Sequence, residues 1–344
     1  MDSSLILSVR NLKTHFKLDE GILKAVDGVD FDIQLRKTLG IIGESGCGKS
    51  VTAFSIMRTV LLPGKVVAGT MEFQLSTNET VDLAQQDPFG RKMRSIRGKE
   101  ISMIFQEPIT SLSPVHTIGD QVTEMILLHR THNKKEAKQI AIEMLNKVGL
   151  PNPAQRFNEY PHMLSGGMCQ RAMIAQALSC NPSLLIADEP TTALDVTVQA
   201  QILDLISHLQ QEFGMSVMYI THDLGVIAEI ANSVAVMYLG RIVELSNTIT
   251  IFKNPLHPYT QRLIKAIPSL TSRRSVRLEN IKGNVPVPLD PPDECGFYSR
   301  CLLARDGLCN MGIPPLVEVE PGHQVRCFLV NGSTQHSRPG EGGL

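Results

Sequence analysis

The stretch Gly43-Glu44-Ser45-Gly46-Cys47-Gly48-Lys49-Ser50 has four variable residues between a glycine and Gly-Lys-Ser, which is the spacing of a phosphate-binding loop. Its small residues let the backbone curl so that successive N–H groups point inward, and a following helix would direct its positive end at the phosphates. In this pattern Lys49 reaches the β and γ phosphates, and the Ser50 hydroxyl ligates Mg²⁺. The stretch therefore predicts a nucleotide site.

The residues on either side of the loop support this prediction. Residues 38–42 form a short apolar run that indicates a buried strand entering the loop, and residues 51–60 indicate a helix leaving it. We expect the nucleotide to contact the loop and the first turn of that helix. The residues expected in contact are Gly43, Glu44, Ser45, Gly46, Cys47, Gly48, Lys49, Ser50 and Val51.

Composition narrows the class of protein. At 344 residues the chain is long enough for a sizeable core, and its 33 basic and 34 acidic residues nearly cancel, so no global charge favours nucleic acid. The N-terminus lacks the pattern of a signal peptide, and charges interrupt every apolar run well short of the about 18 residues of a membrane span. We therefore expect a reducing compartment, with Cys47, Cys169 and Cys180 as small buried residues.

The first hundred residues have the pattern of strands. Residues 5–9 and 25–33 alternate between apolar and polar side chains, and Asp19-Glu20-Gly21 supplies turn residues between them. Residues 63–100 mix proline, glycine and asparagine with short β-like runs. They indicate sheet-edge structure with loops.

The remainder of the chain predicts helices, parallel strands and an irregular end. Apolar residues recur at helical spacing over 134–148, with Gly149 as a cap, and this helix is expected in an inserted helical subdomain. Residues 184–187 and 217–220 are continuous apolar runs, which suit parallel strands covered on both faces. Past residue 250 prolines are frequent, and we expect a separate appendage beginning near Asn254.

Two further motifs resemble those of the ATP-binding subunit of an ABC transporter. Residues 183–190 look like a Walker B strand, in which Asp188 would hold Mg²⁺ and Glu189 would orient and deprotonate the attacking water. Residues 164–168 resemble the signature loop, whose serine and two glycines act on nucleotide held by another subunit. They correspond to Ser165, Gly166 and Gly167, and Met168 departs from the glutamine usual in the family.

The same resemblance assigns roles to four more residues, each of which has a simpler structural explanation. Gln106 would sense Mg²⁺ and water at the Q-loop, although a glutamine that ends a strand is usually just solvated. His222 would contact the γ-phosphate, and Asp195 would lie in the D-loop while also capping a helix. Phe16 would stack on adenine, or it is a plain core residue.

Several stretches resemble the dipeptide and oligopeptide permease branch of this family: residues 104–114, 188–203, 257–260 and 266–268. The resemblance implies a peripheral protein on the cytoplasmic face of the inner membrane. Its expected partners are two membrane permease subunits, a second ATPase subunit that is a paralogue or another copy, and an external substrate-binding protein, with no nucleic acid. Residues 328–344 are an unassigned tail.

Four cysteines lie in the expected appendage, and the permease branch carries a quartet there. The resemblance implies a [4Fe-4S] cluster, while a Cys₄ set also suits Zn²⁺, and unligated thiols are a further alternative. The quartet is Cys295, Cys301, Cys309 and Cys327.

Together these features predict an α/β protein: a P-loop NTPase (RecA-like) core with an antiparallel β subdomain, an inserted helical subdomain and the cysteine-containing appendage. The expected divisions are 1–105, 106–164, 165–253 and 254–344. The expected function is ATP hydrolysis, with ATP and Mg²⁺ bound, that energises import of dipeptides or oligopeptides. Alternatives are import of nickel or another non-peptide solute, a non-transport ABC ATPase, and a regulatory module that senses redox state or metal.

Overall fold

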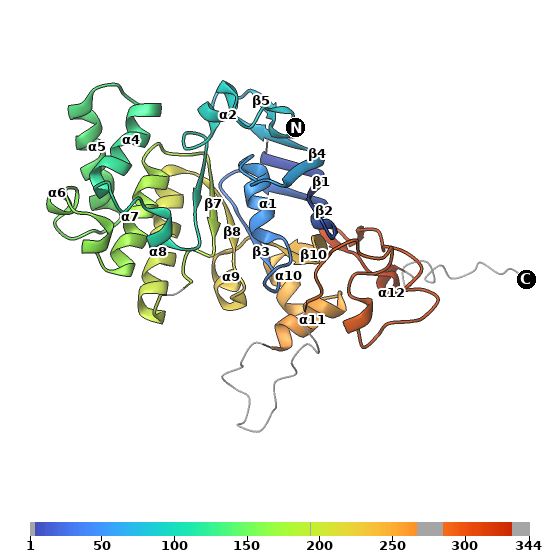
Figure 1. Cartoon of the computed structure of the whole chain (residues 1–344). Coiled ribbons are helices and arrows are strands. Elements are labelled where there is room, and N and C mark those ends of the chain that lie inside the picture. The colour runs from blue at the N-terminus through green and yellow to red at the C-terminus, as the bar shows by residue number, and fades with distance from the viewer. Residues whose placement is uncertain (1–3, 193, 267–284, 332–344) are drawn as a thin grey trace, which may run out of the picture.

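The structure is a computed structural model that describes residues 4–192, 194–266 and 285–331. Its centre is an eight-stranded sheet with strand order β11-β12-β10-β9-β3-β8-β7-β6 (Figure 1). Within this sheet, β9, β3, β8, β7 and β6 are neighbours and run parallel to one another. The strands are β3 (Thr38–Ile42), β6 (Ile101–Ile104), β7 (Leu184–Asp188), β8 (Ser216–Ile220), β9 (Ser233–Tyr238), β10 (Arg241–Asn247), β11 (Val317–Glu320) and β12 (His323–Val325).

The parallel strands separate two hydrophobic cores. In β7, Leu185 and Ala187 belong to one buried cluster, whereas Leu184 and Ile186 belong to the other. This alternation follows from the two-residue period of a strand, and it explains why the run is apolar throughout. Each fully buried Leu or Ile contributes about 1.5–3 kcal/mol to folding.

A second, antiparallel sheet has the strand order β2-β1-β4-β5 and packs beside helix α1 (Lys49–Ile56). Its strands are β1 (Leu5–Leu18), β2 (Gly21–Gln34), β4 (Gly64–Gln74) and β5 (Thr80–Asp82). The expected turn at 19–21 joins β1 to β2, but both strands are longer than their alternating patterns. β-Bulges between Val9 and Leu12 account for the break in alternation.

A helical subdomain lies at the other end of the molecule (Figure 1). Helix α4 (Ile118–His129) begins with a capping box between Thr117 and Asp120, and α5 (Lys134–Lys147) begins at Asn133, whose side chain accepts two backbone N–H bonds. The other helices there are α3 (Pro108–Ser111), α6 (Pro153–Arg156), η2 (Pro161–Met163) and α7 (Gly166–Leu178).

The remaining helices cover the sheet or connect its strands. They are η1 (Leu83–Gln85), α2 (Arg91–Ile96), α8 (Val196–Phe213), α9 (Leu224–Ile230), α10 (Thr248–Lys253), α11 (Pro258–Lys265), η3 (Tyr298–Arg300) and α12 (Phe328–Asn331). Within the described ranges, no helix has both the length and the apolar character required to cross a bilayer.

Three expectations differ from the structure. The helix expected over 51–60 ends at Ile56, because Arg58 has a left-handed backbone with a φ of 55°. The segment expected to be only edge strands and loops contains α2. The C-terminal segment is not separate from the core, because β12 pairs with β10 and Phe297 packs against Tyr238 with ring centroids 5.2 Å apart.

Some expected features lie outside the described residues. They include residues 1–3, Ala193 beside the D-loop aspartate, Ile267 and Pro268 of the permease-branch motif, and residues 332–344 of the tail. Cys47, Cys169 and Cys180 are buried, as predicted.

Candidate nucleotide site

The phosphate loop connects β3 to α1 and depends on glycine at two tightly enclosed positions. Gly43 has a φ of 154°, and a Cβ added there would lie 2.3 Å from the Met237 carbonyl oxygen. Gly48 has a φ of 100°, and its added Cβ would lie 2.2 Å from the Ala25 carbonyl oxygen. Only glycine fits both the space and the backbone conformation, so the neighbouring chain fixes the path of the loop.

Three polar side chains converge where the loop enters α1. Nζ of Lys49 donates to the carbonyl oxygens of Gly43 at 2.9 Å and Glu44 at 3.1 Å, and only 5% of the Lys49 residue is exposed. Oγ of Ser50 donates to Oδ1 of Asp188 at 3.1 Å. Burial raises the pKa of Asp188, which is the last residue of β7. A buried carboxylate beside a hydroxyl offers the oxygen ligands that Mg²⁺ prefers.

Glu189 lies at the centre of a second polar group. Its Oε2 accepts bonds from Nε2 of Gln106 at 3.3 Å and from Oγ1 of Thr192 at 3.0 Å, and it lies 3.3 Å from Nδ1 of His222. Glu189 has a φ of 47°, a left-handed conformation that is uncommon outside glycine and often occurs at functional sites. These side chains come together because β6, β7 and β8 are parallel and end at the same edge of the sheet.

An open cleft of about 1010 Å³ connects the two groups. Lys49, Ser50 and Val51 line one part of it, together with Glu44, Ser45, Gly46 and Gly48 of the loop; Gln106, Glu189 and His222 line another. Phe16 and the chain segment that contains Val287 also line the cleft and add apolar surface to it. The cleft therefore combines an apolar wall, a cationic loop and a carboxylate that could accept a proton from water.

The signature-loop and D-loop residues do not line this cleft. Ser165 caps α7, where its Oγ accepts from the N–H of Met168 at 3.4 Å, and Gly166 and Gly167 form the first turn of that helix. Asp195 caps α8 and accepts from the N–H of Val198 at 3.0 Å. The first turns of α7 and α8 lie side by side, as shown by the 3.1 Å distance between a Cβ added to Gly167 and the side chain of Val198.

The sequence reasoning missed two sets of contacts. Thr192 donates directly to Glu189, and only its position three residues further along the chain could have indicated this. Glu44 is bound by two distant residues: Tyr259 accepts from its N–H at 2.9 Å, and Arg300 pairs with its carboxylate. Tyr259 belongs to the permease-branch stretch 257–260, so that stretch contacts the phosphate loop.

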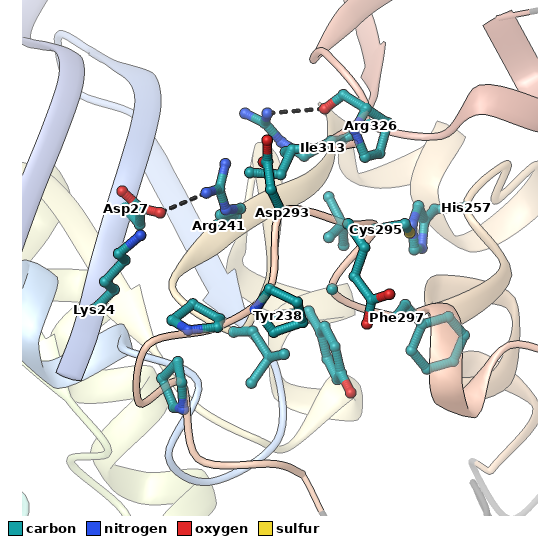
Figure 2. A pocket seen from close by; sticks show the side chains of 18 residues that line it. Lys24, Asp27, Tyr238, Arg241, His257, Asp293, Cys295, Phe297, Ile313 and Arg326 are labelled. Carbon is teal, nitrogen blue, oxygen red and sulfur yellow. Dashed lines mark hydrogen bonds and ion pairs between the residues drawn. The ribbon is translucent and has the colours of Figure 1, made fainter. Parts of the chain in front are cut away.

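A smaller cavity of about 160 Å³ lies between the β9–β10 hairpin and the C-terminal segment (Figure 2). Arg241 pairs there with Asp27, and Arg326 donates to the carbonyl oxygens of Ile242 and Pro314. Both guanidinium groups are thus engaged within the protein.

The cysteine quartet does not form a site for a single metal ion. Among the described residues, no three His, Cys, Asp or Glu side chains are grouped so that they could hold one. This arrangement supports neither the expected [4Fe-4S] cluster nor the alternative of Zn²⁺. Cys309 and Cys327 are buried, and Cys295 and Cys301 are partly buried.

Comparison with protein families agrees with this fold and cleft. A family model described as ABC transporter matches residues 26–192, and one described as the C-terminal region of oligopeptide and dipeptide transporters matches residues 243–309. The chain belongs to the ATP-binding subunits of ABC transporters, a class of ATP-hydrolysing enzymes. Within that class it falls in the branch that carries the oligopeptide and dipeptide transporter C-terminal region.

Three curated relatives match almost the full chain. A probable peptide ABC transporter ATP-binding protein from Sinorhizobium fredii is 49% identical and is covered to 96%, as is this chain. The oligopeptide transport ATP-binding protein AppD of Bacillus subtilis is 49% identical, covering 95% of this chain and 97% of the relative. The dipeptide transport ATP-binding protein DppD of Escherichia coli is 43% identical, with 94% and 96% covered.

A solved structure is similar over the ATPase core. It is a dimeric post-hydrolysis state of the ATP-binding cassette MJ0796 bound to ADP and Pi, with a TM-score of 0.61 and 27% identity, covering 70% of this chain and 98% of that one. The fold class predicted from the sequence is thereby confirmed.

Proposed function

We propose that this chain is the ATP-hydrolysing subunit that energises import of dipeptides or oligopeptides through a membrane ABC transporter. The observation that carries the proposal is the position of Glu189, which contacts Gln106 and lies beside His222 at the edge of the cleft that contains the phosphate loop. The printed names of the relatives support a peptide as the transported solute.

In this proposal the loop residues 43–50 and Val51 bind the phosphates of ATP, and Phe16 stacks on adenine. Lys49 contacts the β and γ phosphates. Ser50, Asp188 and Gln106 hold Mg²⁺, which supplies charge neutralisation on the phosphate oxygens. Glu189 orients water and accepts its proton, and His222 contacts the γ-phosphate. Catalysis arises mainly from positioning and charge stabilisation.

The second half of each ATP site comes from another ATPase subunit. Ser165, Gly166 and Gly167 lie outside the cleft of their own chain, as does Asp195, which supports their action in trans. The similarity to a dimeric cassette supports the same arrangement. The partner is a second copy or a related subunit, and the pair contacts two permease subunits at the cytoplasmic face of the membrane, with an external substrate-binding protein.

Reconstitution tests this function directly. The chain, its permease subunits and its substrate-binding protein are placed in liposomes, and uptake of a labelled dipeptide or oligopeptide is measured with internal ATP. We expect ATP-dependent uptake that Glu189→Gln abolishes. Equal uptake by Glu189→Gln would contradict the catalytic assignment, and ATP hydrolysis stimulated only by a non-peptide solute would contradict the substrate.

We also propose that the cysteine quartet holds an iron–sulfur cluster rather than a single ion. Such a cluster takes one thiolate at each of several corners, so its ligands do not converge on one atom. Burial, and then the neighbouring thiols of Cys327, Cys309 and Cys301, raise the pKa of Cys295 to about 11. The main chain also links two of the four residues, since the N–H of Cys295 donates to the carbonyl oxygen of Cys309 at 3.0 Å.

Backbone donors fit this proposal. The N–H of Arg305 donates to Sγ of Cys309 at 3.5 Å. The backbone N–H groups of Phe297 and Leu303 favour the thiolate forms of Cys295 and Cys301, in opposition to burial, which raises the pKa of both thiols. Hydrogen bonds to sulfur stabilise thiolates and tune clusters of this kind. Anaerobically purified protein should contain iron and sulfide and absorb visible light, and Cys327→Ser should lose this absorbance. Protein without bound iron or visible absorbance would contradict the cluster.

A further inference from the structure

The phosphate loop is bonded to the C-terminal segment through an ion pair between Glu44 and Arg300. Nη1 of Arg300 donates to Oε2 of Glu44 at 2.7 Å, and Nη2 donates to Oε1 at 3.0 Å. The pairing is bidentate, the geometry in which Arg–carboxylate bonds are strongest and most directional. The Arg300 side chain is only 5% exposed, whereas that of Glu44 is 28% exposed. The pair therefore has little freedom to exchange with solvent.

Aromatic residues of the core hold Arg300 in place. Its Nη1 lies 3.3 Å from the Tyr238 hydroxyl, and its guanidinium lies 5.8 Å from the centre of that ring. Tyr238 packs against Phe297, three residues before Arg300, and both are among the side chains that surround the smaller cavity (Figure 2). These contacts therefore hold the guanidinium group in position independently of its ion pair with Glu44.

The charge of Glu44 is unfavourable for the chemistry of the loop. Glu44 lines the same cleft as Lys49 and Ser50, where a polyphosphate would lie. Like charges at this range repel strongly when solvent is partly excluded. A neutralising cation that also fixes the carboxylate by two hydrogen bonds removes this repulsion.

We propose that Arg300 is a positioning residue of the ATP site, which neutralises Glu44 and keeps its carboxylate away from the phosphates of ATP. Residues 285–331, which include Arg300 and the four cysteines, then contribute to ATP binding through the position of Glu44. This inference rests on the assignment of residues 43–50 to ATP. Arg300 acts through Glu44 and makes no contact with nucleotide itself.

The test compares ATP affinity, KM and kcat in the full-length chain and four variants. Arg300→Gln should bind ATP about tenfold more weakly, because an unpaired Glu44 then faces the phosphates. In the Glu44→Gln background the same change should cost less than about twofold, so the double variant should match the ATP affinity of Glu44→Gln alone. The matched control Arg305→Gln changes an exposed arginine of the same segment and should bind normally.

The defect of Arg300→Gln should appear in KM and ATP affinity and leave kcat nearly unchanged. The difference in ATP affinity between Arg300→Gln and wild type should become smaller at about 1 M salt, because the Debye length is then about 3 Å and the repulsion is screened. If Arg300→Gln fails to fold, Arg300→Lys takes its place in the test. This variant keeps the charge but loses the bidentate geometry, so its ATP affinity should be lower than that of wild type by less than about fivefold.

Two outcomes would overturn the proposal: wild-type affinity in Arg300→Gln, or an equal loss of affinity when the same change is made in the Glu44→Gln background, which would make Arg300 a structural brace only. Lys49→Ala separates this from failure of the ATP site itself. If Lys49→Ala binds ATP as wild type does, the assignment of residues 43–50 fails, whatever the Arg300 variants show.

Discussion

Oε2 of Glu189 lies 3.3 Å from Nδ1 of His222, with His222 at the end of β8 and Glu189 at the end of β7. The His222 side chain is 63% exposed, while that of Glu189 is 14% exposed. The imidazole therefore faces the open cleft and lies beside the partly buried carboxylate. This relationship gives the two side chains different expected roles in hydrolysis.

Replacing His222 with alanine should slow hydrolysis about 100-fold while ATP affinity changes less than about threefold. The reason is that, in the proposed site, His222 contacts the transferred phosphate while residues 43–50 supply most of the binding. Steady-state hydrolysis and equilibrium ATP binding measure the two effects. His208→Ala, an exposed histidine on α8, is the control and should be silent. Equal losses in both variants would contradict the role of His222.

Two glycines of the phosphate loop should respond differently to alanine. Gly48→Ala should abolish ATP binding, because its Cβ would lie 2.2 Å from the Ala25 carbonyl oxygen. Gly46 also has a positive φ, of 80°, but its added Cβ meets nothing within 4 Å, so Gly46→Ala should cost only about 1 kcal/mol of backbone strain. Thermal unfolding and ATP titration check both. Similar behaviour of the two variants would count against the close approach at Gly48.

The half-site arrangement predicts that hydrolysis requires two chains. Isolated protein should bind ATP readily, yet its turnover per chain should rise with protein concentration. For a dimer of two copies of this chain, mixing Lys49→Ala with Ser165→Ala should restore about a quarter of wild-type activity, because half of the dimers then contain one intact site. Robust turnover by a strictly monomeric preparation would contradict this arrangement.

Buried His257 should make the fold sensitive to acid. Burial, and then Arg326, lower its pKa to about 3, whereas an unfolded histidine has a pKa of about 6.5. Below about pH 6.5, His257 therefore binds a proton in the unfolded chain but stays neutral in the folded chain. Stability present above that pH should fall by about 2 kcal/mol at pH 5.

The matched variant is His257→Asn, since asparagine can replace the Nδ1 acceptor that caps α11 without titrating in this range. Denaturant unfolding at pH 7.5 and pH 5 should show a smaller loss in the variant than in wild type. Equal losses of unfolding free energy in the variant and in wild type would show that a group other than His257 causes the acid sensitivity.

The sequence predicted those parts of the site that depend on local pattern and on parallel strands. The phosphate loop is one continuous stretch, and Gln106, Glu189 and His222 meet because each follows a parallel strand that ends at the same sheet edge. Ligand positions of this kind follow from topology. They need no knowledge of side-chain packing.

Contacts between distant segments could not be predicted in this way. Arg300 and Glu44 are 256 residues apart, and no periodicity links them. Strands β11 and β12 have only four and three residues, so the pairing of β12 with β10 and of β11 with β12 has no clear hydrophobic pattern in the sequence. The C-terminal segment therefore looked separate, although Tyr259 and Phe297 are both part of the main core.

We propose that Glu189 activates the water that hydrolyses ATP held by residues 43–50. The most direct test is Glu189→Gln, which keeps the size of the side chain and removes its charge. ATP binding and hydrolysis are measured on the same preparation, together with dimer formation. Glu189→Gln should bind ATP normally, hydrolyse it at least about 100-fold more slowly and accumulate as an ATP-bound dimer. Unchanged turnover in Glu189→Gln would contradict this proposal.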